Sequence, residues 1–413
     1  MKSLVTRSFP AVIAVGLLFN ATQAGAQTPH PGMPAAPLAG GYPAMEGGGQ
    51  YMDASGRPIV LPASYCEPGM GGGYCPEGGY GACGPGEGYA DFGGYSMPDQ
   101  CGPHYFDVAI QTVFLKGEDL FEDVQPFGAI GADGPDEAPR ILDPQNSFDE
   151  YEAGWQIAAR YDIGPLSVLE GTYMGIYDIG FTESVTASQV SPFIPFGLTT
   201  VFSDYGVNID PTLGLDQGET YTLNYQSDLQ STEFSYRRYW VGNNPRISGT
   251  YLAGARYIRM TEELTFSALA LDELSEPVNT SLLWDSENDM VGFQFGGDAW
   301  IQLRQGLRIG NETKVGIYNN RYRFRRLVNT ANEAFNFDIS TKDDQIAFAG
   351  ESSLDMVADI LPSFSIRAGY RALYMNSLVT AGNNVNPDIT TTALLTQADA
   401  VYHGFQAGLE YIY

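Results

Sequence analysis

The sequence predicts an all-β fold: an antiparallel transmembrane β-barrel of about ten strands, within a range of about eight to twelve, after a Gly/Pro-rich N-terminal segment. Three observations predict it. Beyond residue 26 there is no apolar run of the length that a membrane-spanning helix needs. From Tyr105 onward, apolar and polar residues alternate with the period of a strand. Short and long connections also alternate, an asymmetry that is typical of bacterial outer-membrane barrels.

Composition narrows the classes of function. The chain has 413 residues and a formal net charge of −28, from 49 acidic and 21 basic residues. Such a chain repels phosphates, which excludes a nucleic-acid binder. Acidic disordered chains contain few aromatic residues, whereas this chain has 26 Tyr and 22 Phe. Abundant aromatic residues fit a barrel, where they form girdles at the membrane interfaces.

The N-terminus resembles a secretory signal peptide over residues 1–26. Lys2 and Arg7 precede a short apolar run at residues 11–19, and Ala24-Gly25-Ala26 has the small residues of a cleavage site. We therefore expect export, and with a β-barrel this implies the bacterial outer membrane as the location.

Residues 27–103 form a Gly/Pro/Cys-rich segment that we expect to stay periplasmic and of low complexity. The segment has too few large apolar residues to offset the entropy of ordering it. Its cysteines predict two disulfides in one of three pairings. A zinc site is the less favoured alternative, because no Cys-x-x-Cys spacing is present and His104 is the only histidine close to the cysteines. The four cysteines are Cys66, Cys75, Cys83 and Cys101.

The barrel is expected over residues 104–413. Its last strand shows the alternation most clearly, with Phe405, Leu409 and Tyr411 separated by Gln406 and Glu410. We expect the chain to end on this strand with an aromatic residue that the barrel-assembly machinery recognises. The expected strands are 105–115, 152–163, 166–181, 221–240, 246–270, 282–303, 307–319, 344–359, 363–378 and 399–413.

The connections set the orientation. Tight turns at 164–165, 242–245, 304–306 and 360–362 are assigned to the periplasm. The intervening segments are expected to be long outer loops. These loops are 116–150, 182–219, 271–281, 320–343 and 379–398.

The barrel half resembles the beta-barrel porin-7 family of outer-membrane proteins. The resemblance implies an outer-membrane barrel behind a signal peptide, and no established catalytic residues. The matching segments, in order, are Tyr105-Phe106-Asp107-Val108, Gly254-Ala255-Arg256-Tyr257, Asn288-Asp289-Met290-Val291-Gly292-Phe293-Gln294-Phe295-Gly296, Ala368-Gly369-Tyr370-Arg371 and His403-Gly404-Phe405-Gln406-Ala407-Gly408.

Charged residues of both signs recur on the polar face of the expected strands, which would face the lumen. A barrel of about ten strands is only slightly wider than an eight-stranded one, whose interior is filled by side chains. Opposite charges in so narrow a space should pair, so these residues predict a charge network that plugs the barrel. Its expected members are Arg160, Glu170, Glu233, Arg237, Arg256, Asp298, Arg304, Arg308, Glu312, Glu351, Asp355, Arg367, Arg371 and Glu410.

Catalysis is not expected. Of the three histidines, His403 has the parity of the apolar face, where a histidine is a poor general base. No motif for a metal or cofactor is present. The basic run Arg321-Arg323-Arg325-Arg326 fits either charge compensation, which we favour, or contact with lipopolysaccharide phosphates.

Two functions remain open, with an outer-membrane enzyme as a weaker third. The first is a structural barrel or a passive narrow pore, biased toward cations by its acidic loops. The second is a surface barrel that binds a ligand or another cell without channel activity. Expected partners are outer-membrane lipids, the barrel-assembly machinery, and small solutes or cations.

Overall fold

The computed structural model describes residues 106–412, except for 119, 122–123, 132–138, 148–149, 165, 191–196, 209–212, 245, 272–276 and 389–395. The predicted signal peptide, the Gly/Pro/Cys-rich segment, its four cysteines and His104 lie outside these residues. Within the described ranges, no helix is both long and apolar enough to span a membrane.

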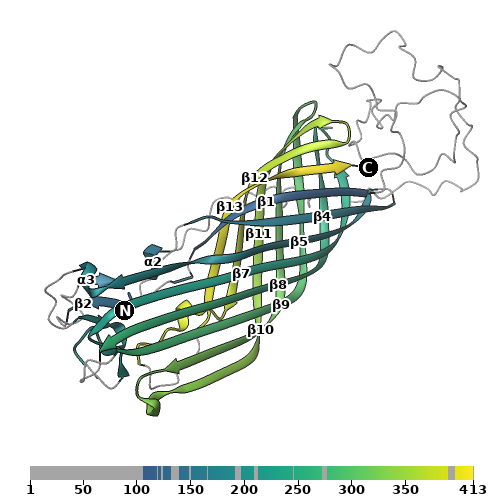
Figure 1. Cartoon of the computed structure of the whole chain (residues 1–413). Coiled ribbons are helices and arrows are strands. Elements are labelled where there is room, and N and C mark those ends of the chain that lie inside the picture. The colour runs from purple at the N-terminus through teal and green to yellow at the C-terminus, as the bar shows by residue number, and fades with distance from the viewer. Residues whose placement is uncertain are drawn as a thin grey trace, which may run out of the picture.

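Ten antiparallel strands form a closed ring (Figure 1). The ring closes because β1 pairs with both β4 and β13, while β7 pairs with both β5 and β8. The prediction of a ten-stranded antiparallel barrel is confirmed. In ring order the strands are β1 (Phe106–Glu118), β4 (Glu152–Gly164), β5 (Ser167–Thr186), β7 (Gly218–Val241), β8 (Ile247–Leu271), β9 (Pro277–Arg304), β10 (Leu307–Asn329), β11 (Phe337–Leu361), β12 (Phe364–Leu378) and β13 (Ala398–Ile412).

The end of the barrel that carries the long connections is called here the loop end, and the opposite end, which carries the tight turns, is the turn end. Several short helices and strands lie at the loop end. Three short strands extend the sheet from β7 in the order β6, β2, β3. The short elements are β2 (Gly128–Ile130), β3 (Arg140–Ile141), α2 (Pro144–Ser147), α3 (Ala187–Val190), β6 (Leu198–Thr200), η1 (Val201–Ser203), η3 (Glu333–Phe335) and η4 (Gly382–Asn384).

Strands β9, β10 and β11 continue far into segments that the sequence predicts as loops. β10 and β11 pair without interruption up to Val328 and Phe337, so the expected loop at 320–343 is mostly a hairpin. Likewise, β9 begins at Pro277, inside the expected loop at 271–281. These loop predictions are wrong because the two segments are polar, and in 320–343 also charged on the outer face, so that their composition is that of a loop although the strands continue.

Large apolar side chains are exposed on the outer face of all ten ring strands. Phe293 of β9 is the extreme case, with 79% of its surface exposed. At about 3.3 Å per residue and about 45° of tilt, the run at residues 291–303 of β9 spans roughly 28 Å, close to the known apolar band of membrane barrels. The belt includes Ile110, Trp155, Tyr177, Phe234, Tyr251, Val291, Phe293, Phe295, Ile317, Ile346, Phe348, Leu354, Ile366, Phe405 and Leu409.

The outer face of β9 changes character abruptly above this belt. Val291 and Phe293 are apolar and exposed, whereas Glu287 and Asp289, on the same face, are charged. The cross-strand neighbours of Asp289 are Arg259 and Arg321, which are charged as well. A boundary between lipid and water therefore lies just below Asp289, and the strands project well beyond it.

The inner face changes at the same level, in the opposite sense. Trp284 and Met290, above the boundary, are buried inside the barrel. Gln294 and Asp298, below it, are buried polar residues on the same inner face. Above the boundary the barrel is mainly apolar inside, with a few buried polar side chains, and polar outside; below it the arrangement is reversed.

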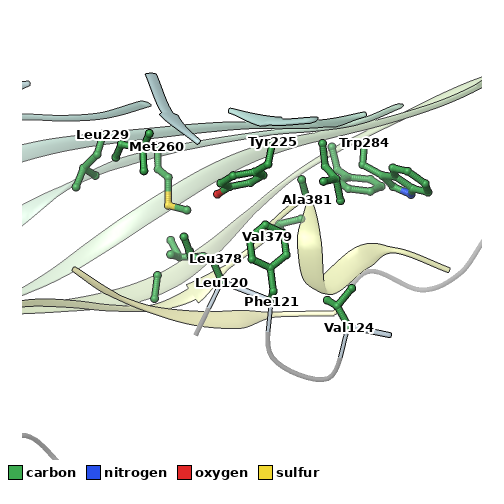
Figure 2. Close-up of a cluster of buried hydrophobic side chains, with 14 of the residues drawn as sticks. Leu120, Phe121, Val124, Tyr225, Leu229, Met260, Trp284, Leu378, Val379 and Ala381 are labelled. Carbon is green, nitrogen blue, oxygen red and sulfur yellow. The ribbon is translucent and has the colours of Figure 1, made fainter. Parts of the chain in front are cut away.

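The loop-end half of the interior contains the main apolar core. Three connections contribute to it: the one after β1, with residues 120–121, 124–127 and Leu142; the one between β5 and β7, with Leu198 and Leu215; and the one that begins at the end of β12, with residues 378–381. Figure 2 shows Leu378, Val379 and Ala381 in one cluster with Tyr225 of β7 and Trp284 of β9. Phe121 packs edge-on against Tyr225, with ring centroids 4.7 Å apart. This core fills the barrel above the boundary.

One expectation about the belt needs correction. Gly297 shares the outward parity of Phe295, which predicts that it tolerates larger apolar residues. A Cβ atom at Gly297 would lie 2.4 Å from the Thr250 carbonyl oxygen on the neighbouring strand. The position is outward but too close to backbone to accept a side chain.

The boundary predicts that the outer face of β9 tolerates a charged substitution above it and not below it. Phe295→Arg places a charge in the lipid belt and should cost about 2–4 kcal/mol in stability, since that is the penalty near the midplane of a barrel. Leu283→Arg has the same parity on the same strand but lies above the boundary, so it should change little. Denaturant unfolding of both variants in lipid vesicles measures the difference, and equal penalties would contradict the boundary.

Candidate functional site: the filled interior of the barrel

Arg237 of β7 is the centre of the charged cluster in the turn-end half. Its guanidinium lies 2.6 Å from Glu170, 3.0 Å from Asp298 and 2.5 Å from Glu312, on three other strands. Thr250 donates a further hydrogen bond to Asp298. Because only 3% of the Arg237 side chain is exposed, its charge is compensated by these carboxylates and not by water.

A second centre lies around Glu233 of β7. Arg256 approaches Glu233 at 3.4 Å and Glu351 at 2.7 Å. Lys314 lies 3.0 Å from Glu233 and 3.4 Å from Glu312. Lys314 thereby joins the two centres into one network.

The remaining predicted members extend this network around the barrel. Their ion pairs are Arg160 with Glu170 and Glu410, Arg308 with Glu410, Arg367 with Asp355, and Arg371 with Glu351. These contacts join strands far apart in the ring, for example β10 with β13 through Arg308 and Glu410. The acids and bases therefore meet across the lumen and not only along its wall.

Two differences from the predicted set have simple causes. Arg304 shares the inward parity but is exposed at the turn between β9 and β10, because β9 ends there. The network also includes neutral side chains that a search for charges overlooks. Gln294 donates to Glu233 at 2.8 Å, and Gln406 donates to Asp355 at 2.5 Å.

The loop-end half is closed by a segment that enters the barrel from β12, residues 377–382, which we call the inner segment. Ser377 has a left-handed φ of 55°, which turns the chain inward. Leu378 and Ala381 are completely buried. The segment was not predicted from the sequence, because most of it falls at the start of the expected outer loop at 379–398.

Wall side chains bond the backbone of the inner segment. Asn288 of β9 donates to the Val379 carbonyl at 2.8 Å and accepts from the Val379 amide at 3.0 Å. Asn320 of β10 donates to the Ser377 carbonyl at 3.1 Å. Buried backbone groups that lack a strand partner need such bonds, so these amides fix the segment across the lumen.

Glu262 of β8 is an acidic residue that also bonds the backbone of the inner segment. It accepts hydrogen bonds from the Tyr225 hydroxyl at 2.7 Å, the Ser286 hydroxyl at 3.1 Å and the Ala381 amide at 2.7 Å. Burial raises the pKa of the Glu262 carboxyl, although these three donors act in the opposite direction. Glu262 is thus a buried acid that connects three wall strands to the inner segment.

The predicted basic cluster is divided between the two faces of β10. Arg321, Arg323 and Arg325 point outward above the lipid boundary, and each meets a carboxylate on a neighbouring strand. Arg326 points inward, within 3.5 Å of the Asn386 carbonyl oxygen. This geometry favours charge compensation within the wall. The outward pairs are Arg321–Asp344, Arg323–Glu287 and Arg325–Asp338.

His403 lies on the outer face of β13, as its parity predicts. Its Nε2 is 3.0 Å from Glu118, and its Nδ1 is 2.5 Å from the Tyr370 hydroxyl. Both ring nitrogens are therefore engaged on the outside of the wall, away from the charged network in the lumen. No group of three or more His, Cys, Asp or Glu residues in the described part of the chain is arranged to hold a metal ion.

The sequence matches no family model and no curated protein. Among solved structures, the protein is similar to the outer membrane protease OmpT from Escherichia coli, with a TM-score of 0.42 and 10% sequence identity. The match covers 77% of this chain and 98% of that chain. The protein is also similar to a major outer membrane protein from Thermus thermophilus, with 8% identity, coverage of 75% and 100%, and a TM-score of 0.28. These values are too low to carry an inference about activity.

The contacts of Arg237 predict a large loss of folding stability when its guanidinium is removed. Arg237→Met leaves the buried Glu170 and Asp298 and the half-buried Glu312 without their common cation, and it should cost about 3–5 kcal/mol, as expected for a broken buried ion pair. Arg325→Met removes an exposed arginine with one carboxylate partner and should cost no more than about 1 kcal/mol. Equilibrium unfolding in lipid vesicles compares the two, and similar losses would show that the network adds no stability.

Glu262 predicts a pH-dependent term in stability. Because the pKa of Glu262 is raised in the folded state, the unfolded chain releases this proton at a lower pH than the folded protein does. The free energy of unfolding therefore decreases as the pH rises from the ordinary Glu pKa of about 4.3 to the raised pKa of the folded state. Below that window both states are protonated and the penalty is absent. Glu262→Gln stays neutral, so it should lose this slope. Unfolding free energies of both proteins against pH measure it, and parallel curves would contradict it.

Proposed function

We propose that this protein is an outer-membrane barrel with a closed interior, and that its projecting loop end is the part that acts at the cell surface. The observation that carries the proposal is closure at two levels. The charged network fills the turn-end half, while the inner segment and the apolar core fill the loop-end half. The exposed apolar belt on all ten ring strands supports the membrane location.

This proposal favours the structural and surface-binding alternatives over a passive pore. Removing lumen charges alone leaves the loop-end half closed, because Leu378, Val379 and the core around them remain in place. We also infer that the protein is not an enzyme and that lipids and the barrel-assembly machinery are its general partners. Membership of the beta-barrel porin-7 family remains a proposal that rests on the sequence segments alone.

Planar-bilayer recording tests the closed state. The wild-type protein should show no stable conductance, because the charged network and the apolar core fill the two levels. The double variant Arg367→Ser with Arg371→Ser should also remain closed, although it opens the charged level. Stable conductance steps from the wild type would contradict the proposal and restore a porin, and steps from the double variant alone would show that the apolar level does not seal.

A further inference from the structure

A cavity of about 550 Å³ lies at the loop end, on the side where the barrel wall is low. Its wall comes from residues 124–125 after β1, from Val201 of η1, from Gly382, Asn383, Val385 and Pro387 in and after η4, and from residues 396–399 at the start of β13. The strands on this side are short: β13 begins at Ala398 and β1 ends at Glu118. The volume is within the usual range of small-molecule sites.

Hydrogen bonds of Asn384 join the two chain segments that border the cavity. Asn384 donates to the Thr380 carbonyl at 2.8 Å and to the Thr396 carbonyl at 3.1 Å. It also accepts from the Thr396 amide at 2.7 Å. The segment around η4 and the segment before β13 are therefore fixed relative to each other.

The lining offers hydrogen-bond acceptors and one negative charge. Among the described residues, Asp399 is the only ionisable one that lines the cavity. One of its oxygens accepts from the Tyr374 hydroxyl at 2.8 Å. A ligand that fits must bring donors and, preferably, a positive charge.

We propose that this cavity binds small organic cations that carry a primary ammonium group. The ammonium would donate to Asp399, and its alkyl part would pack against Val124, Val201 and Val385. The charge of the whole chain, −28, raises the local concentration of cations near the mouth. The inference rests on the proposal that the loop end is the working surface.

The test is calorimetric titration of the full-length protein in detergent with putrescine, and with 1,4-butanediol as a neutral probe of similar length. Putrescine should bind saturably and at least about tenfold more tightly, since a charge-assisted hydrogen bond contributes about 1.5–3 kcal/mol. Asp399→Asn keeps an acceptor for Tyr374 but removes the charge, and it should weaken putrescine binding by a similar factor.

Glu333→Gln is the matched control, because Glu333 is an exposed acid in η3 that does not line the cavity. Its affinity for putrescine should equal that of the wild type. Equal binding of the two probes, equal effects of the two variants, or no saturable binding would each overturn the proposal. None of these outcomes affects the closed barrel, which the conductance recordings test separately.

Discussion

The outer face of each long strand meets lipid along one part of its length and water along the rest, and this change of solvent determines where the polar groups lie. Lipid does not solvate a charged side chain, so below the boundary the charged side chains point inward. There Arg237, Glu170 and Asp298 compensate one another's charges. Above the boundary the outer face is in water, so the apolar side chains lie inside, as in a soluble barrel. The same strands, with unchanged parity, therefore build two different interiors.

The two interiors close the barrel by different physical means. The charged half relies on nearly complete pairing, which makes it sensitive to the loss of one residue that serves several partners, such as Arg237. The apolar half relies on packing and on the inner segment, which leaves the sheet after Leu378 and whose backbone is bonded by Asn288, Asn320 and Glu262. A function at the loop end follows more naturally from this architecture than transport through it.

Much of the fold was predictable, because the period-two pattern is a local signal. The ten ring strands and their order follow from alternation and from tight turns such as that at Gly306. The network members also follow from parity, apart from Arg304 at the end of β9 and neutral partners such as Gln294. The inner segment was not predictable, since the bonds that hold it, such as Asn288 to Val379, join residues 91 positions apart. The hairpin beyond Asn319 was missed because exposed charge on an extended strand has the composition of a loop.

The position of the boundary on β9 tests this account most directly. Spin labels at outward positions along β9, from Leu283 through Glu287 and Val291 to Ile301, report accessibility to oxygen in lipid and to a polar nickel complex in water. The account predicts nickel accessibility at Leu283 and Glu287, oxygen accessibility at Val291 and Ile301, and a reversal close to Asp289. Oxygen accessibility that continues up to Leu283, or nickel accessibility at Val291 and Ile301, would contradict it.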